Sequence, residues 1–383
     1  MAKYTEFYRG RRKRRNYALI PSLLLLGILS VTVVLFYSLQ KYAVLSKDGV
    51  EIVLPILEEE GKVVVDSEGH EQIVFPTVEA TIKFEEPDYS GVKAQAGKHL
   101  QGVRAIFVPA GDINVQKLDE YYQRLKSGNA LLLEMKPRSG NLMWNTNAGE
   151  AKNYGMAVST EITNIMPQMV EALKEKDVYV AAQISCCIDE LYASRCTSVA
   201  LRTAYGSNYM DVNGTWLDPY NANLRNYVVE MCRELFAMGF DEVVLADVAH
   251  PVLPADDEGK VQEIAYTRAM STTPSPINAV CGFAMYVADQ LRDVDGVLSI
   301  YCDSKTALAK PDTANGQDAE LFFKLYDRVY LPTDKFAYTY NLQDVEGKVS
   351  IGKAEDRLVP VVINYLPDNS SWILVDQEEE TDD

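Results

Sequence analysis

Three carboxylates that end or follow apolar segments are the first chemical signal in this sequence. Asp247 closes the apolar run of GFDEVVLADVAHP, Glu134 lies near the end of NALLLEMK, and Asp303 follows GVLSIYC. Cleavage of a glycosidic bond needs two carboxyl groups, one acting as an acid and the other as a base or nucleophile. Carboxylates in such places also cap helices and pair with arginine, which is the structural alternative for each. We take Asp247, Glu134 and Asp303 as candidate catalytic residues, with that alternative left open.

Five further side chains near the same segment ends are candidates for binding a substrate. Lys136 and Asp189 offer charge, and His250, which precedes a proline, could carry a proton. Trp216 and Tyr301 could stack on sugar rings. Each has a structural alternative as well, because loop histidines and aromatic residues at a barrel rim often do no more than pack.

The segments that must position these residues alternate between strands and helices from Gly102 onward. Apolar strands that alternate with helices indicate a parallel sheet covered on both faces. The strand-like runs are VRAIFVPA, NALLLEMK, DVYVAAQIS, DEVVLAD, GVLSIYCDS, DRVYLPT, RLVPVVINY and SSWILVD. Eight such units predict an α/β fold, a (β/α)₈ TIM barrel over residues 102–375, in which the active site lies at the carboxyl ends of the strands. The helix DPYNANLRNYVVEMCRELFAMGF is strongly patterned, and Asp218 is its expected N-cap.

The part of the chain before the barrel predicts a membrane anchor. Residues 16–40 carry no charge, and about 20 residues in a helix cross the hydrocarbon core. We expect a basic cytoplasmic tail (1–17), one transmembrane helix (18–39) and a membrane-proximal β segment (46–85). The positive-inside rule then places the barrel outside the cytoplasm, at the cell membrane. A cleaved signal peptide is the alternative.

The charge of the chain is distributed unevenly. Residues 1–17 hold seven of the 37 basic and one of the 55 acidic residues, so the remainder holds 30 and 54, a balance of −24. A body this acidic argues against nucleic acid as a partner. The tail at 376–383 is a solvated acidic end. The six cysteines form no C-x-x-C pair and no zinc-like spacing, so we expect them to be buried, and we expect no metal and no cofactor.

A family resemblance spans residues 102–365. The segments VRAIFVPAG, ALLLEMKPRSGNLMW, VYVAAQIS, WLDPYNANLRNYVVEMCRELFAMGFDEVVLADVAHP and GVLSIYCDS occur in this order. They resemble a glycoside hydrolase family with an α-amylase-like TIM barrel, found in bacterial envelope and secreted proteins. The helix–strand block from Trp216 to Pro251 is the most specific part. The resemblance implies a TIM barrel and a polysaccharide, such as a cell-wall glycan, as substrate or ligand.

The chain departs from that family at the expected site. The fourth strand of the family typically reads F-D-Y-V-R-F-P, and here Ala246 stands at the aspartate while Asp247 replaces the aromatic residue. The second strand keeps its lysine as Lys136 but has Pro137 in place of the acid that follows. The third strand has Gln183 where arginine is usual. Because neighbouring side chains on a strand face opposite ways, Asp247 is expected to face away from the site unless the strand end is kinked.

Two functions therefore compete at this stage. The first is a membrane-anchored, divergent glycoside hydrolase that uses the acids Glu134, Asp247 and Asp303. The second is a catalytically inactive barrel that binds glycan or a protein partner, which Ala246, Pro137 and Gln183 favour. Because an acid shifted by one residue faces the wrong way on a regular strand, the sequence tips slightly toward weak or no catalysis.

Overall fold

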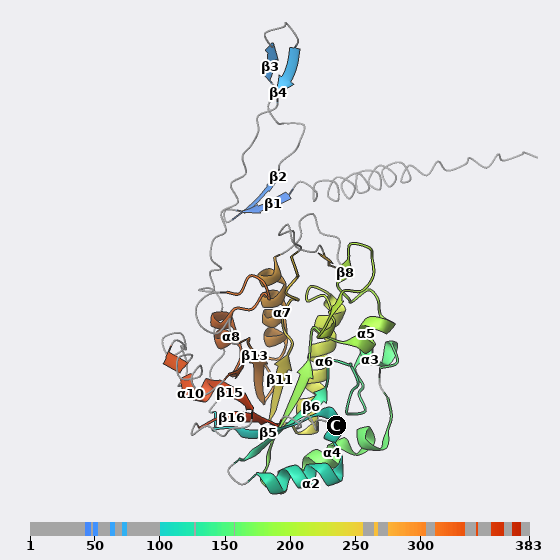
Figure 1. Cartoon of the computed structure of the whole chain (residues 1–383), viewed down its shortest axis with the longest axis vertical. Coiled ribbons are helices and arrows are strands. Elements are labelled where there is room, and N and C mark those ends of the chain that lie inside the picture. Colours follow the sequence, from blue (N-terminus) through green and yellow to red (C-terminus); the bar gives the residue numbers. More distant parts are fainter. Residues whose placement is uncertain are drawn as a thin grey trace, which may run out of the picture. The chain divides into compact units, whose positions relative to one another are not determined.

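A closed barrel of eight parallel strands forms the centre of this protein in a computed structural model (Figure 1). The last strand pairs with the first, since Ile373 is aligned with Ala105. The predicted (β/α)₈ barrel is therefore confirmed. In order around the barrel the strands are β5 (Arg104–Val108), β6 (Ala130–Lys136), β7 (Tyr179–Ser185), β11 (Glu242–Ala246), β13 (Val297–Tyr301), β14 (Arg328–Pro332), β15 (Leu358–Ile363) and β16 (Trp372–Val375).

The structure describes only part of the chain. The described residues are 43–46, 49–52, 62–65, 71–74, 100–125, 128–156, 158–255, 264–266, 275–303, 311–333, 342–343, 354–363 and 370–376. No helix within these ranges is long and apolar enough to cross a membrane. The predicted anchor at 18–39, the basic tail at 1–17 and most of the acidic tail at 376–383 lie outside them. The anchor therefore stays a prediction.

The residues before the barrel include two antiparallel hairpins. Strand β1 (Ala43–Ser46) pairs with β2 (Gly49–Ile52), and β3 (Lys62–Val65) pairs with β4 (Glu71–Val74). These strands lie in or beside the predicted β segment at 46–85, of which residues 75–85 lie outside the described residues. By its internal contacts the chain divides into two units, residues 1–86 and 87–383. The finer boundaries at 46–85 and 102–375 stay predictions.

Helices follow most of the barrel strands, and α6 is the longest helix that the structure describes. They are α2 (Val115–Arg124), α3 (Gly149–Asn153), α4 (Glu161–Lys174), α5 (Glu190–Arg195), α6 (Ala222–Met238), α7 (Pro276–Gln290), α8 (Ala319–Leu325) and α10 (Ala354–Arg357). The predicted cap of α6 is wrong by three residues. The Asn221 side chain accepts from the N–H groups of Asn223 and Leu224, whereas Asp218 is fully buried and accepts from Tyr220. Gly239 ends the helix at φ 106°, which glycine adopts without a steric penalty.

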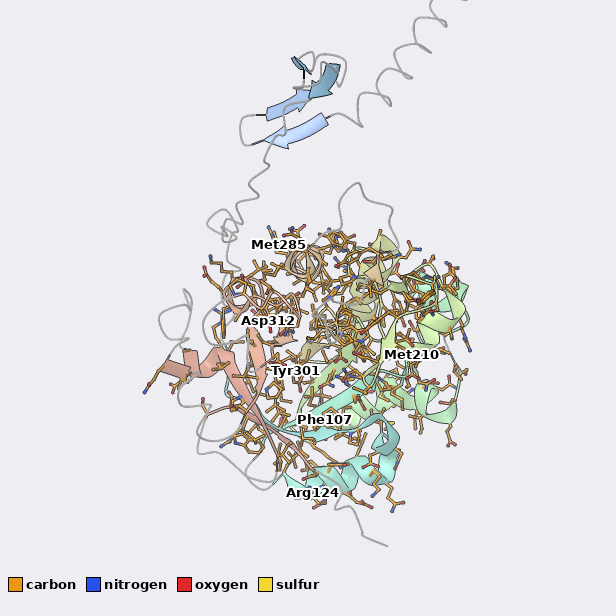
Figure 2. The ribbon with its side chains drawn as sticks, turned by 45° about the horizontal axis from the view of Figure 1, so that its top comes forward. Phe107, Arg124, Met210, Met285, Tyr301 and Asp312 are labelled. Carbon is orange, nitrogen blue, oxygen red and sulfur yellow. The ribbon has the colours of Figure 1, made fainter. Side chains whose placement is uncertain are left out.

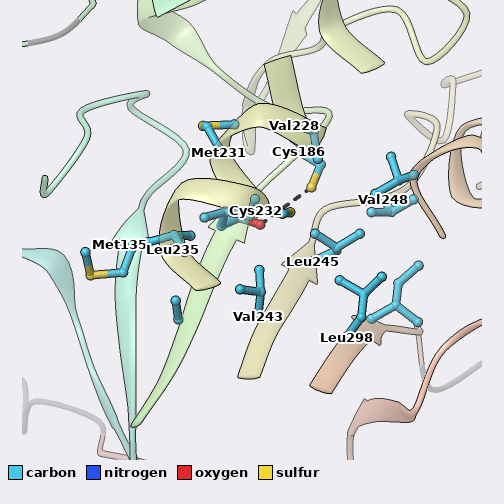
Figure 3. Packing of buried hydrophobic residues seen from close by; sticks show 14 of the residues in the cluster. Met135, Cys186, Val228, Met231, Cys232, Leu235, Val243, Leu245, Val248 and Leu298 are labelled. Atoms are coloured by element: carbon cyan, nitrogen blue, oxygen red, sulfur yellow. Dashed lines mark hydrogen bonds between the residues drawn. The ribbon is translucent and has the colours of Figure 1, made fainter. Parts of the chain in front are cut away.

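Strict alternation along the strands separates two apolar layers. On β6, Leu131 and Leu133 face the helices, while Ala130 and Leu132 face the barrel interior. On β11, Val243 and Leu245 pack outward against α6, as Figure 3 shows. All six cysteines are buried and free, as their sequence context indicates. The same alternation sends every second residue inward, so the last inward positions of the strands lie at the open end of the barrel.

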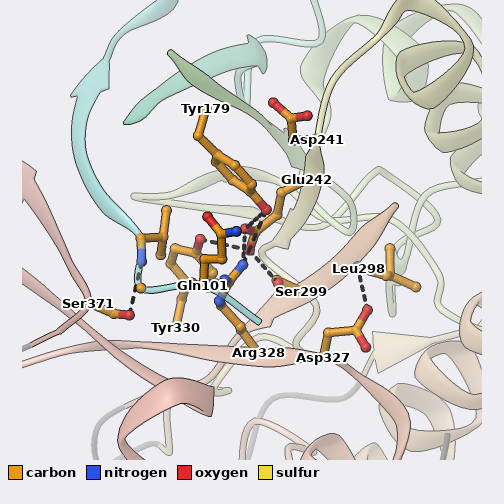
Figure 4. A network of polar contacts seen from close by, with 12 residues as sticks. Gln101, Tyr179, Asp241, Glu242, Leu298, Ser299, Asp327, Arg328, Tyr330 and Ser371 are labelled. Atoms are coloured by element: carbon orange, nitrogen blue, oxygen red, sulfur yellow. Dashed lines mark hydrogen bonds and ion pairs between the residues drawn. The ribbon is translucent and has the colours of Figure 1, made fainter. Parts of the chain in front are cut away.

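A buried ion pair closes the other end of the barrel. Glu242 and Arg328 open their strands, are 0% and 1% exposed, and bond to each other (Figure 4). The hydroxyl groups of Tyr179 and Tyr330 donate to the Glu242 carboxylate, and the Arg328 guanidinium also donates to the Gln101 carbonyl. Such a pair is tolerated in a core only when further hydrogen bonds satisfy its members. This end of the barrel is thus filled, and the chemistry is left to the opposite end.

Candidate active site

A cleft of about 1040 Å³ lies at the carboxyl ends of the barrel strands. Its volume is at the upper end of the range that ligand pockets in proteins occupy. Its floor consists of the last inward-facing side chains of the strands, and its wall comes from the loops that follow them. The polar and aromatic residues that line it are Phe107, Glu134, Arg138, Gln183, Ser185, Tyr209, Asp211, Asn213, Trp216, Asp247, His250, Tyr301, Asp303, Asn315 and Gln317.

Asp247 lies on this cleft because the chain turns sharply at the end of β11. Ala246 is the last inward residue of the strand, so the next side chain on a regular strand would face outward. Asp247 instead has φ 54°, in the left-handed region that few residues other than glycine, asparagine and aspartate adopt. The turn brings both side chains to the cleft. The expectation that the shifted acid faces the wrong way is therefore wrong, and the kinked alternative is the correct one.

Two neighbouring side chains hold the Asp247 carboxylate. The Arg138 guanidinium donates from Nε to both carboxylate oxygens at 3.1 Å and from Nη2 to Oδ1 at 2.6 Å. Ser185 Oγ donates to Oδ2 at 2.6 Å. The hydrogen bond to Asp247 is the main reason that the pKa of Arg138 is raised. Asp247 is thereby fixed in place as an ion-paired carboxylate, at the point where the backbone is strained.

Glu134 is the second carboxylate of the cleft, and its surroundings differ. It points inward from β6 and accepts a hydrogen bond at 3.0 Å from the backbone N–H of Ala110. Burial raises its pKa above the ordinary value, and the negative charge of Asp247 raises it further. The Ala110 hydrogen bond and the Arg138 charge offset only part of that effect. One carboxylate is thus ion-paired and the other is buried with a raised pKa, and such different surroundings can divide the roles of base and acid between two carboxyl groups.

The end of β13 supplies Tyr301 and Asp303 to the same cleft. Burial raises the pKa of the Tyr301 hydroxyl, and the charges of Asp247 and Glu134 raise it further. Tyr301 therefore lies close enough to both carboxylates to respond to their charge. Asp303 is exposed on the cleft wall, and its backbone N–H donates to Gln317 Oε1 at 2.7 Å. The structure thus brings all three candidate catalytic carboxylates to one cleft; whether they act as catalysts is a separate question.

His250 lies on the cleft wall in a constrained, buried position. Its side chain is 4% exposed, and its Nδ1 lies 2.9 Å from the carbonyl oxygen of Pro251. A carbonyl only accepts, so Nδ1 carries the proton and Nε2 is left as an acceptor. Burial lowers the pKa of the ring, which keeps His250 neutral near pH 7. A neutral imidazole can accept a hydrogen bond from a sugar hydroxyl but supplies no positive charge.

Trp216 and Gln183 each direct an unsatisfied polar atom into this region. Trp216 Nε1 and Gln183 Oε1 are buried, and neither makes a hydrogen bond to any residue that the structure describes. Buried polar atoms normally have partners, so a donor and an acceptor without one are suited to a ligand. The Trp216 ring is only 6% exposed, so the expectation that it offers a broad stacking surface is wrong.

Lys136 and Asp189 are the two sequence candidates that the structure removes from direct contact with a ligand. Lys136 Nζ lies 2.8 Å from Asp189 Oδ2, and the two side chains are 1% and 0% exposed. Lys136 also donates to the backbone carbonyl of Ser185 at 2.6 Å. The pair therefore ties the end of β6 to β7 beneath the cleft. The prediction that these residues bind substrate is corrected to a structural role.

Sequence reasoning gave no role to Arg138, which dominates the electrostatics of the observed site. Its position two residues after Lys136 marks it only as a strand-end residue. The bidentate contact to Asp247 depends on the left-handed turn, which no residue pattern in the sequence predicts. A register shift on β6 between Glu134 and Lys136 was equally invisible in the sequence. In the described part of the chain, no group of three or more His, Cys, Asp or Glu side chains is placed to hold a metal ion.

Several solved structures resemble this chain in fold. The glycoside hydrolase domain of PgaB (BpsB) from Bordetella bronchiseptica is 14% identical, with a TM-score of 0.49, over 71% of this chain and 93% of that one. A hypothetical protein from Ruminiclostridium thermocellum ATCC 27405 is 20% identical, with a TM-score of 0.43, over 51% and 96%. Ega3 from Aspergillus fumigatus, in complex with galactosamine, is 10% identical, with a TM-score of 0.40, over 72% and 82%. Such low identity says nothing about activity.

The family assignment comes from the sequence of the barrel itself. None of the curated proteins matches this chain. Residues 105–330, which run from the first barrel strand through the sixth, match the family described as "Putative glycosyl hydrolase domain". The match covers more than half of the 383 residues and contains Glu134, Asp247 and Asp303. The chain is therefore a divergent member of this glycosyl hydrolase-like family.

Proposed function

We propose that this barrel hydrolyses glycosidic bonds in a polysaccharide, with Glu134 and Asp247 as the reacting pair. The observation that carries the proposal is that two carboxylates of opposite character lie on one cleft. Burial raises the pKa of Glu134, whereas Asp247 is ion-paired with Arg138. Membership of a glycosyl hydrolase-like family and the position at the carboxyl ends of the strands support the same conclusion.

The roles of the two carboxylates follow from their surroundings. Glu134, whose pKa is raised by burial, acts as the acid and donates its proton to the oxygen of the leaving sugar. Asp247, which is ion-paired with Arg138 and accepts a hydrogen bond from Ser185, is the base or nucleophile on the other side of the bond. Trp216 and Gln183, which line the cleft, contact the polysaccharide beside the reacting pair. Asp303 contacts substrate from the cleft wall rather than acting in the bond cleavage.

A non-catalytic, glycan-binding barrel is the second candidate function, and one observation favours it. Both oxygens of the Asp247 carboxylate already accept hydrogen bonds, from Arg138 and Ser185. A carboxylate satisfied in this way is a weaker nucleophile or base unless a substrate displaces one of the donors. In this alternative the cleft binds the polysaccharide without cleaving it.

The location of the protein is also part of the proposal. We infer a single-pass protein with a cytoplasmic N-terminus and the barrel outside the cell membrane. The uncharged run at 16–40 and the seven basic residues before it support this topology. Protease added to intact cells should remove the barrel and spare the N-terminal tail. A barrel that resists the protease until the cells are lysed contradicts the topology.

The test of catalysis uses the full chain in detergent micelles. Purified cell-wall and extracellular polysaccharides are incubated with wild type, Glu134→Gln and Asp247→Asn, and new reducing ends are measured. Asp293→Asn is the matched control, because Asp293 also pairs with an arginine but lies at 74% exposure outside the cleft. We expect release by wild type and the control, and losses of ~10²-fold or more in the two cleft variants. Binding without release by the wild-type chain establishes the second candidate instead.

A further inference from the structure

The mouth of the cleft carries three exposed aliphatic side chains. Met210, Val212 and Val252 line the cleft and are 67%, 101% and 64% exposed. Met210 and Val212 belong to a short hairpin made of β9 (Met210–Asp211) and β10 (Gly214–Thr215), and Figure 2 labels Met210 there. A solvent-facing hairpin tip is usually polar, since turns favour glycine, asparagine and aspartate. Aliphatic groups gathered at the mouth of a cleft indicate a surface that a ligand covers.

This hairpin is held in position over the reacting carboxylates. At its tip, Asn213 Oδ1 accepts from Arg138 Nη1 at 3.2 Å, so one guanidinium contacts both the hairpin and Asp247. The backbone N–H of Asn213 donates to Asp211 Oδ1 at 2.7 Å, which closes the turn. At its base, the backbone N–H of Trp216 donates to the backbone carbonyl of Tyr209. Met210 and Val212 are therefore held close to Arg138 and Asp247, and Val252 lines the same cleft.

The side chains of the rim, Met210, Val212 and Val252, and the charges of the cleft limit which kind of sugar can cover the rim. Flat aromatic rings suit the faces of sugar rings, whereas branched and flexible aliphatic groups suit a methyl or short acyl group. Arg138 is the one cation among the described lining residues, and Asp247 already engages it. An anionic sugar would therefore meet carboxylates without a cation to receive it. A neutral, acylated sugar meets neither obstacle.

We propose that Met210, Val212 and Val252 form a subsite for the acyl group of an N-acylated amino sugar, next to the reacting pair. This rests on the proposed function, in that the cleft binds a polysaccharide. The acyl methyl group packs on the aliphatic rim, and the sugar ring extends from it toward Glu134 and Asp247. The subsite sets which unit of the polymer is accepted, and it takes no part in the bond cleavage.

The experiment compares matched glycans and near-isosteric variants of the full chain in detergent micelles. The probes are the chitin hexamer and solubilised peptidoglycan strands, each measured before and after chemical de-N-acetylation. The variant is Met210→Gln, Val212→Thr and Val252→Thr combined, which keeps the shape of each side chain and makes it polar. The control is Val115→Thr, because Val115 is also 64% exposed but lies on α2, away from the cleft. Affinities are measured by calorimetry, with release of reducing ends recorded in parallel.

The expected result is selective. Wild type and the control bind at least one N-acetylated probe at least fivefold more tightly than its de-N-acetylated counterpart, and the triple variant loses that preference without a change in melting temperature. Tighter binding of the de-N-acetylated probes, which would point to a cationic sugar drawn by the carboxylates, overturns the subsite. So does an unchanged preference in the triple variant, or a wild type that binds none of the probes. A lost preference in a chain that releases no reducing ends refutes hydrolysis and leaves the subsite standing.

Discussion

Replacement of Asp247 by asparagine separates a catalytic role from a structural one. Asparagine tolerates the left-handed backbone at this position and can still accept the hydrogen bond from Ser185. What it loses is the ion pair with Arg138, whose side chain is 48% exposed. An ion pair with a partner this exposed contributes ~0.2–1 kcal/mol, so the free energy of unfolding should fall by less than about 1 kcal/mol. The same change shifts Tm by about 2–4 °C in a domain of about 150–250 residues, and a larger chain should shift by less.

The expected effect on turnover is larger than the effect on stability. Loss of a positioned acid or base lowers kcat by ~10²-fold or more, which corresponds to about 2.7 kcal/mol of transition-state stabilisation. Thermal unfolding and kcat are measured on the same preparation of each variant. Asp247→Gly and Asp247→Ala complete the series, since glycine accepts the left-handed turn and alanine pays about 1 kcal/mol for it. An alanine variant as stable as the glycine variant refutes the strained turn, and an unchanged kcat in Asp247→Asn refutes the catalytic role.

Three further outcomes test the remaining parts of the structure. The pKa of Glu134 is raised in the folded state, so wild type loses stability as the pH rises from the ordinary glutamate pKa through the folded pKa. The free energy of unfolding of Glu134→Gln, measured with urea, should therefore equal that of wild type near pH 3 and exceed it at pH 7. Glu242→Gln leaves Arg328 buried without its counter-charge and should cost about 3–5 kcal/mol, seen as a lowered Tm with unchanged KM in the folded fraction. Lys136→Met should destabilise by a similar amount through the uncompensated Asp189, also at unchanged KM; a raised KM at normal stability would restore its binding role.

The barrel could be predicted from the sequence because its signal is repeated. Each strand carries an apolar run, and the parallel sheet buries both faces of it, so eight separate segments gave the same indication. The rule that active sites lie at the carboxyl ends of barrel strands then placed Glu134, Asp247 and Asp303 together. All three line the observed cleft. Regular periodicity and a known topology were sufficient for this much.

The details of the site could not be predicted because they depend on single backbone irregularities. The left-handed turn at Asp247 reverses the side that alternation assigns to it. Sequence also could not tell that Lys136 and Asp189 neutralise each other below the cleft, since a strand-end charge is equally compatible with exposure. Trp216 was expected to stack on sugar rings, but its side chain is only 6% exposed. Each error concerns one residue's orientation, which residue type alone does not determine.

The departures from the family pattern change where charge lies in the cleft. The acid of the fourth strand is one position late, yet the turn at Asp247 returns it to the cleft. The arginine usual on the third strand is replaced by Gln183, which is aligned with Glu134 on the neighbouring strand. A guanidinium at that place would favour the charged form of Glu134 and lower its pKa. Glutamine leaves burial as the dominant influence, while Arg138 supplies the positive charge to Asp247 instead. Glu134 and Asp247 keep different electrostatic surroundings because Arg138, the one cation among the described lining residues, is ion-paired with Asp247.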